Sequence, residues 1–256
     1  MLLLLPPSEG KAPGGDGGVL DLDGLSFPEL TAVRRTLVAA LVRLARREPR
    51  KLRAALGLGV SQGGEVAADA ALRTSPTAPA LQRYNGVLYD ELGYGTLPAA
   101  ARRRADTSVV VASALFGLVR PGDRIPYYRL SGTTALPGVR PLRALWRPAL
   151  STVLQAQPGL VVDLRSAAYA ALAPVPGSLQ VRVLREQGGR RTVVSHDNKY
   201  TKGRLARQLC LHGARTAGDV AAHAASVADR VELDGTTLDL VLHGLASGRP
   251  EGQVGG

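Results

Sequence analysis

Short apolar runs that stop abruptly at polar residues constrain this chain more than any other feature. Residues 2–5 (LLLL) end at two prolines, and SVVVASALF (108–116) and GLVVDLRS (159–166) likewise run into polar segments. Runs of this length, rich in branched aliphatic residues, are typical of buried strands. Chains commonly deliver functional side chains at such strand ends. The sequence therefore predicts a sheet whose strand ends carry the candidate site residues.

Helical spacing marks several of the other segments. Residues 28–48 place apolar side chains on one face, and 57–80 is only weakly patterned. Two glycine-containing turns, within REQGGRRT (185–192) and VELDGTTLDLVLHG (231–244), indicate hairpins. Further helices are expected over 49–56, 80–93, 98–105, 202–213 and 217–226, and RRTVVSHD (190–197) is expected to be a strand.

This mixture predicts an α+β (mixed α/β) fold. We expect a single compact domain over residues 1–247, with a mixed sheet flanked by helices and a basic cleft. Residues 248–256 are expected to form a frayed tail.

The charge balance favours an anionic partner. The chain has 256 residues, 45% of them hydrophobic, and 32 Lys plus Arg against 21 Asp plus Glu, for a net charge of +11. Arginine provides most of the positive charge, and its planar guanidinium binds phosphate and carboxylate groups in a bidentate way. The partner is therefore expected to be the phosphate backbone of DNA or an anionic small molecule.

Other classes of protein find little support. Cys210 is the single cysteine, so there is no disulfide framework. The four histidines are scattered along the chain, and neither a metal site nor a cofactor is expected. The run at residues 2–5 is too short for a signal peptide or a membrane span. We expect a cytoplasmic protein, with no membrane partner, and favour a monomer.

Polar side chains cluster after two of the predicted strands. GLVVDLRS places Asp163, Arg165 and Ser166 directly behind its apolar run, where an Asp–Arg pair and a serine helix cap are the plainer alternative. VVSHDNKYTKGR (193–204) opens a basic helix, and a lysine near a helix N-terminus is unfavourable unless an anion compensates. A solvated basic turn is the alternative there. The candidate residues of this segment are His196, Lys199, Lys202 and Arg204.

The loop SALFGLVRPGDRIPYYR (113–129) holds four charged residues in and around the segment between Pro121 and Pro126. Arg120 and Arg129 are expected to face an anion, Asp123 to pair with a neighbouring arginine, and Tyr128 to be a candidate for proton transfer. The N-terminal PPSEGKA adds Lys11, either in a cleft or in a solvated turn. It is not a phosphate-binding P-loop, because the glycine and the hydroxyl residue that this motif needs on either side are missing.

LPGVRPLRAL (136–145) resembles the hairpin of a helix-hairpin-helix DNA-binding motif. Gly138 fits the pattern, whereas Arg140 stands where a second glycine is usual, and a plain loop before a helix remains the alternative. Asp163 lies twenty-five residues past Gly138, near the spacing of the essential aspartate in glycosylases of this class. However, those enzymes are helical, and Asp163 ends a strand-like run.

Several blocks together resemble the YaaA (DUF328, UPF0246) family of peroxide stress proteins. They are LLPPSEGK, RYNGVLYDEL, SALFGLVRPGDRIPYYRL, LWRPAL, VVDLRSAAY and KYTKGRLAR, in this order. The resemblance implies a cytoplasmic protein that limits oxidative DNA damage by lowering available iron, with a positively charged cleft that binds DNA. It brings no established catalytic residues. Arg165 and His196 depart from many relatives and imply a more basic cleft in this branch.

Three functions therefore stand side by side, and whether the protein is an enzyme stays open. The first is non-specific DNA binding through phosphates, and the third is a glycosylase or lyase that uses Asp163. The second is an enzyme for a small anionic or nucleotide-like substrate. Its charged residues would be Lys11, Arg120, Arg129, Arg165, Lys199 and Lys202, and its proton-transfer candidates His196, Asp163, Ser166 and Tyr128.

Overall fold

The computed structural model describes residues 1–243, so the predicted tail at 248–256 lies outside the described residues. Its main sheet has the order β4-β3-β1-β6-β7-β10-β9, with β8 paired to β7. Neighbours from β3 to β10 run parallel, and β4, β8 and β9 pair antiparallel. The strands are β1 (Leu2–Leu5), β3 (Val109–Ser113), β4 (Gly117–Val119), β6 (Val161–Asp163), β7 (Leu179–Gln187), β8 (Arg190–Thr192), β9 (Arg230–Asp234) and β10 (Thr237–His243).

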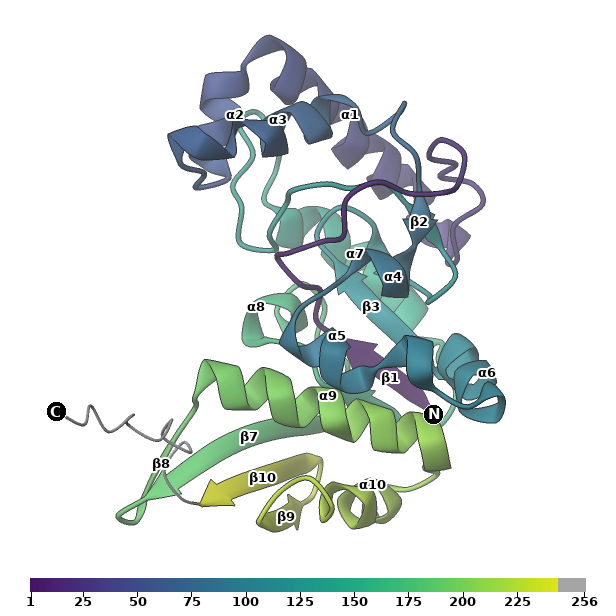
Figure 1. Cartoon of the computed structure of the whole chain (residues 1–256), viewed down its shortest axis with the longest axis vertical. Coiled ribbons are helices and arrows are strands. Elements are labelled where there is room, and N and C mark those ends of the chain that lie inside the picture. Colours follow the sequence, from purple (N-terminus) through teal and green to yellow (C-terminus); the bar gives the residue numbers. More distant parts are fainter. Residues whose placement is uncertain (244–256) are drawn as a thin grey trace, which may run out of the picture.

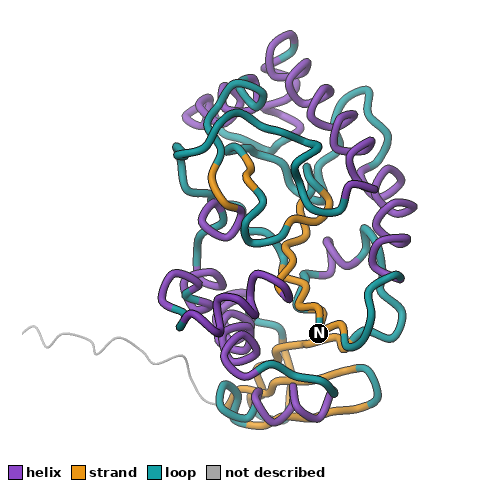
Figure 2. Tube along the Cα trace, turned by 90° about the vertical axis from the view of Figure 1, so that its right-hand side faces the viewer, coloured by secondary structure: helices purple, strands orange, loops and turns teal. Residues whose placement is uncertain are grey.

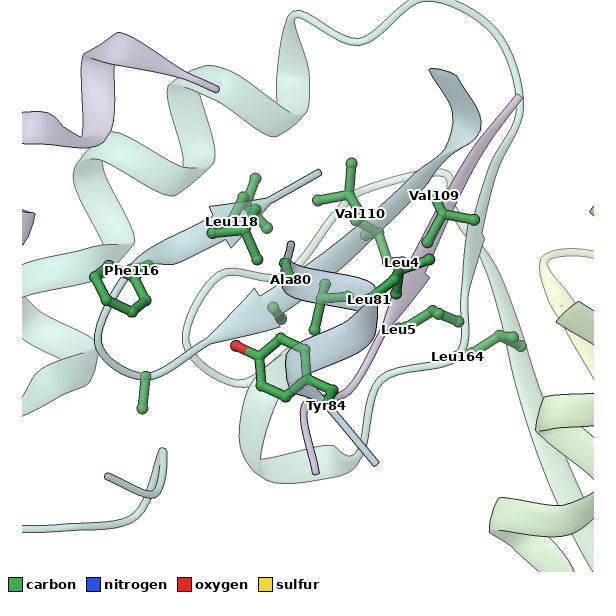
Figure 3. Packing of buried hydrophobic residues seen from close by; sticks show 14 of the residues in the cluster. Leu4, Leu5, Ala80, Leu81, Tyr84, Val109, Val110, Phe116, Leu118 and Leu164 are labelled. Carbon is green, nitrogen blue, oxygen red and sulfur yellow. The ribbon is translucent and has the colours of Figure 1, made fainter. Parts of the chain in front are cut away.

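The N-terminal leucines form an inner strand of this sheet. Leu3 lies opposite Val109 of β3 on one side and Val162 of β6 on the other. All four leucines of β1 are buried, which explains why the run is apolar without alternation. Figure 3 shows Leu4 and Leu5 packed among the buried side chains of β3 and the short helix α4 (Ala80–Arg83).

Helices cover both sides of the strands (Figure 2). Figure 1 shows the three N-terminal helices at one end of the molecule and β7, β9 and β10 at the other, with α9 lying across β7. A short ladder of β2 (Ala78–Pro79) and β5 (Arg124–Ile125) completes the sheets described. The remaining helices are α1 (Thr31–Arg47), α2 (Pro49–Ala55), α3 (Gly63–Ala70), α5 (Val87–Leu92), α6 (Ala99–Ser108), α7 (Leu142–Gln155), α8 (Ala167–Ala170), α9 (Ser195–His212) and α10 (Ala217–Ala224), with 3-10 turns at Pro28–Leu30, Val60–Gln62 and Tyr94–Thr96.

The predicted mixed α/β architecture is confirmed. Both expected hairpins form, as β7–β8 and β9–β10, but β10 also pairs in parallel with β7 along its whole length. This long-range pairing makes the sheet mostly parallel. The hairpin patterns alone could not indicate it, because they report only neighbours in sequence.

Two local predictions were wrong, and the stretch 57–80, for which only a weak pattern was noted, contains α3. The helix expected over 80–93 is broken before Gly86, whose φ of 92° does not fit a helix. The strand expected over 190–197 stops at Thr192, and helix α9 begins already at Ser195.

The helix-hairpin-helix element predicted at 136–145 is only half formed. Gly138 adopts a φ of 69° in a turn, and α7 follows it. No helix precedes the turn, since residues 126–141 carry none. Pro126, Pro137 and Pro141 explain this, because proline lacks the amide proton that a helix interior needs.

Candidate functional site

The topology points to the carboxyl ends of β1 and β6. From β1 the chain leads to β3 on one side, whereas from β6 it leads to β7 on the other. Neighbouring parallel strands whose connections diverge leave a crevice at their carboxyl ends, where ligands of α/β proteins commonly bind. The segments 6–11 and 164–169 leave the sheet at this edge. This edge is therefore the candidate functional site.

Lys11 is buried at this edge, with 6% of its surface exposed. Its Nζ donates to the carbonyl oxygens of Ser8, at 3.1 Å, and Glu9, at 3.2 Å. The ammonium also lies 4.4 Å from the centre of the Tyr128 ring, a cation–π contact. Burial, followed by the positive charge of Arg129, lowers the pKa of Lys11 to about 8. A sizeable share of the amine is therefore neutral near physiological pH.

Three buried hydroxyl groups form a chain beside Lys11. The Tyr128 hydroxyl lies 2.9 Å from that of Tyr84 and 2.8 Å from Oγ of Ser113, the last residue of β3. Burial raises the pKa of Tyr84 to about 12, so its hydroxyl stays protonated. Tyr128 therefore holds together two segments that meet at the end of the sheet, and its role as a proton-transfer group stays a prediction.

Asp69 of α3 contacts the backbone of Arg129, next to Tyr128, and the sequence analysis did not identify it. It is fully buried; Oδ1 accepts from the backbone amide of Arg129 at 2.8 Å, while Oδ2 has no hydrogen-bond partner. Burial, together with the nearby charge of Glu65, raises the pKa of Asp69 to about 8. A carboxyl group with such a pKa is mostly protonated at neutral pH.

Arg129 joins Lys11 to Asp69. Its Nη1 donates to the same Glu9 carbonyl oxygen that Lys11 contacts, at 3.2 Å, and its Nη2 lies 3.4 Å from the Glu9 carboxylate. The side chain of Arg129 is 22% exposed, and that of Glu9 is 79% exposed. The contact between this guanidinium and the Glu9 carboxylate is therefore long and open to solvent.

Other predicted site residues are turned inward. Nε and Nη2 of Arg165 donate to the two carboxylate oxygens of Asp163, at 2.9 and 2.7 Å, and both side chains are 1% exposed. Nζ of Lys202 donates to the carbonyl oxygen of Leu164 at 3.1 Å, and burial lowers its pKa to about 8. Asp163, Arg165 and Lys202 hold the end of β6 against α9. For Asp163 and Arg165 this is the structural ion pair that the sequence had left open as the alternative to a site.

Arg120 also has a structural environment. Its backbone amide donates to Asp123 at 2.9 Å, its side chain to the carbonyl oxygen of Thr107 at 2.6 Å, and its guanidinium lies over the ring of Phe27. Asp123 was predicted to pair with a neighbouring arginine, and its carboxylate accepts from the backbone amide of Arg120, as well as from Ser26.

The first turn of α9 is open to solvent. His196 is exposed there, Lys199 is exposed just beyond this turn, and Ser166 is exposed at the start of α8. Val194, which precedes the helix, provides no side-chain cap, and the carboxylate of Asp197 in the first turn is paired with Arg185. Arg204 lies further along the helix over the ring of Tyr200. Arg140 is exposed beside the turn at Gly138.

Two cavities lie away from this edge. One of about 310 Å³ is bordered by Arg50 and Arg53 of α2, and one of about 620 Å³ lies beside Met1, at the amino end of β1. The second contains His212 and His223, whose rings stack with 5.2 Å between centres, a pair that the spacing in sequence does not suggest. Within residues 1–243, no three His, Cys, Asp or Glu side chains gather as metal ligands, and no helix could span a bilayer.

The fold and this edge define a mixed α/β protein with buried acid–base groups at the carboxyl ends of its parallel strands. Comparison with known proteins identifies its family. The family model described as peroxide stress protein YaaA matches residues 1–226. The chain belongs to this family, as the blocks from LLPPSEGK to KYTKGRLAR had predicted.

Related proteins cover nearly the whole chain. A UPF0246 protein of Corynebacterium efficiens is 46% identical over 241 residues, which are 91% of this chain and 96% of the relative. A UPF0246 protein of Streptomyces coelicolor is 48% identical over 225 residues, 85% of this chain and 86% of the relative. One of Corynebacterium glutamicum is 43% identical over 253 residues, 94% of this chain and all of the relative.

Proposed function

We propose that this member of the peroxide stress family acts in the cytoplasm by binding DNA non-specifically through its phosphates. The observation that carries the proposal is the exposed start of α9, with His196 in its first turn and Lys199 just beyond it, in a chain of net charge +11. Asp197 lies in the same turn, and its carboxylate is paired with Arg185. Free amide groups at a helix N-terminus and nearby cations together favour a phosphate.

Arg129 extends this surface in the proposal. Among the described residues its guanidinium donates only to Glu9 oxygens, at 3.2 and 3.4 Å, so a phosphate could replace the exposed carboxylate. Arg165 and Lys202 take no direct part, because their polar groups already bond within the protein. The proposal therefore uses fewer basic residues as phosphate contacts than the sequence analysis had put forward as candidates.

The test is the salt dependence of binding to a fluorescent duplex. We expect the logarithm of the association constant to fall linearly with the logarithm of salt concentration, with a slope of about −0.9 for each phosphate neutralised. Lys199→Ala and Arg129→Ala should each reduce that slope by about one phosphate. Arg35→Ala is the matched control, since it also removes one arginine but from an exposed ion pair with Asp23 on another part of the molecule.

Two results would sink this proposal. One is the absence of binding at low salt, and the other is an equal loss of affinity in Arg35→Ala and Lys199→Ala. The glycosylase alternative receives no support from the contacts of Asp163, because both carboxylate oxygens accept from Arg165. Release of damaged bases by the wild type, lost in Asp163→Asn, would restore that alternative.

A further inference from the structure

We propose that Lys11 is a nucleophilic amine that condenses with the carbonyl group of a small anionic aldehyde or ketone, with Asp69 as the proton donor and Arg129 as the anion-binding group. This reaction shares Arg129 with the proposed DNA binding but does not depend on it, because the adduct on Lys11 is measured without DNA. It rests on three observations at the carboxyl end of β1: the surroundings of the amine, the free oxygen of the acid and the shared contact at Glu9.

Burial and the neighbouring guanidinium of Arg129 make the amine of Lys11 easier to deprotonate than that of an ordinary lysine. Within residues 1–243 no carboxylate is bonded to its Nζ, which contacts two backbone carbonyl oxygens and the face of Tyr128. Desolvated lysines next to another cation are the ones that form imines with carbonyl substrates, because the neutral amine is the nucleophile. The second cation here is Arg129, and the resulting pKa of Lys11 is about 8.

Asp69 supplies the acid that such a reaction needs. A fully buried carboxyl oxygen without a hydrogen-bond partner is costly in a folded protein unless the group is protonated or meets a ligand. Oδ2 of Asp69 is such an atom, since Oδ1 alone accepts from the Arg129 amide. Asp69 accepts from the backbone amide of Arg129, whose guanidinium shares the carbonyl oxygen of Glu9 with Lys11, so the three residues belong to one cluster.

The class of substrate follows from the charges. Nη1 of Arg129 and Nζ of Lys11 share the carbonyl oxygen of Glu9, so an anionic group on the guanidinium would bring the rest of a small molecule to the amine. Arginine binds phosphate and carboxylate alike. We therefore assign a carbonyl compound that carries one of these two groups, and the experiment below separates them.

The condensation takes place in two steps, addition to the carbonyl group and loss of water. The Lys11 nitrogen attacks the carbonyl carbon, and a proton moves from nitrogen to the carbonyl oxygen to give a carbinolamine. Asp69 then donates its proton to the hydroxyl group, the C–O bond breaks and water leaves. The product is an iminium ion on Lys11 beside the carboxylate of Asp69, a pair of opposite charges in a buried site.

The chain is well suited to a direct test, because it has only four lysines, Lys11, Lys51, Lys199 and Lys202. The wild-type protein is incubated with glyceraldehyde 3-phosphate, with pyruvate or with uncharged glyceraldehyde, and borohydride reduces any imine to a stable amine. Peptide mass spectrometry then locates the adduct. We expect the label on Lys11, and more of it from one of the two anionic probes than from glyceraldehyde.

Lys202 is the matched internal control. It is buried to the same extent as Lys11 and burial lowers its pKa to about 8 as well, but its carboxylate neighbour Asp163 is fully bonded to Arg165. Label on Lys11 but not on Lys202 supports the proposal. Label confined to the exposed Lys51 and Lys199, or equal label on all four lysines, overturns the proposal. This test uses the wild-type protein and so does not depend on the folding of any variant.

Two variants separate the roles. Asp69→Asn keeps the acceptor for the Arg129 amide and removes the acidic proton, so imine formation at Lys11 should slow by about 100-fold while the near-ultraviolet circular dichroism is unchanged. Arg129→Ala should abolish the preference for the anionic probe and leave the slow reaction with glyceraldehyde. An unchanged rate in Asp69→Asn contradicts the role of the acid.

Discussion

The carboxylate of Asp163 and the guanidinium of Arg165 form a bidentate ion pair inside the protein, with distances of 2.9 and 2.7 Å. Nη2 of Arg165 donates also to the carbonyl oxygen of Ala173 at 3.1 Å, and Nε2 of Gln180 donates to Asp163 at 3.2 Å. A charged pair so fully bonded fixes the segment that follows β6. The two site candidates of this segment thus form the buried Asp–Arg pair that the sequence offered as the alternative.

Breaking this pair should destabilise the protein strongly. Arg165→Ala leaves the Asp163 carboxylate buried without its partner, and we expect the free energy of unfolding to fall by about 3–5 kcal/mol in urea denaturation. Arg35→Ala removes an ion pair whose side chains are 58% and 70% exposed, and should cost less than about 1 kcal/mol. Equal effects of the two substitutions would contradict the structural role of Arg165.

Asp69 should make stability depend on pH. In the unfolded chain this carboxyl group releases its proton near its ordinary pKa of 3.8, whereas in the folded protein it keeps the proton up to about 8. The folded state therefore binds more protons over this range, and the stabilising contribution, present below pH 4, is lost as the pH rises towards 8. Its full size is on the order of 5 kcal/mol.

The measurement is urea denaturation from acidic to mildly alkaline pH. Asp69→Asn should flatten the profile between the two pKa values, because an amide does not titrate. A variant whose stability still falls with the wild-type slope would show that other groups cause the dependence.

The hydroxyl of Tyr128 should contribute measurably to stability. Tyr128→Phe keeps the ring beside Lys11 but leaves the buried hydroxyl of Tyr84 without its partner, whereas Ser113 still accepts from the amide of Phe116 at 3.0 Å. An unsatisfied buried hydroxyl costs about 1–3 kcal/mol. Tyr200→Phe, at a side chain exposed to solvent, should change the free energy of unfolding by less than about 0.5 kcal/mol.

The contact of α9 with α5 should require glycine at position 203. A Cβ on Gly203 would lie 2.4 Å from the carbonyl oxygen of Leu88 and 2.7 Å from Cβ of Glu91. Gly203→Ala should therefore push the two helices apart and lower the unfolding free energy by about 1–3 kcal/mol. In thermal denaturation, Gly218→Ala in α10, where the nearest atom is 3.6 Å away, should be neutral or stabilising.

Local pattern was sufficient for part of the site. Lys11, Tyr128 and Arg129 were recognisable because they follow strand-like runs or lie in a charged loop that contains two prolines. Asp69 was not, since α3 has little pattern of its own and gains its place by packing on α1. A buried acid on a weakly patterned helix leaves no signal in a single sequence, because its burial comes from distant segments.

The sequence by itself determined the buried strands, the two hairpins and membership of the peroxide stress family, since these depend on side chains close together in the chain or on whole motifs. Only the tertiary structure decided which charged side chains are bonded to groups inside the protein and which meet one another at the end of β1. Arg165 and Lys202 are held by groups inside the protein, while Lys11 meets Arg129, more than a hundred residues away, at the end of β1. Charge is a property of each residue, but its desolvation and its partners depend on how remote segments pack.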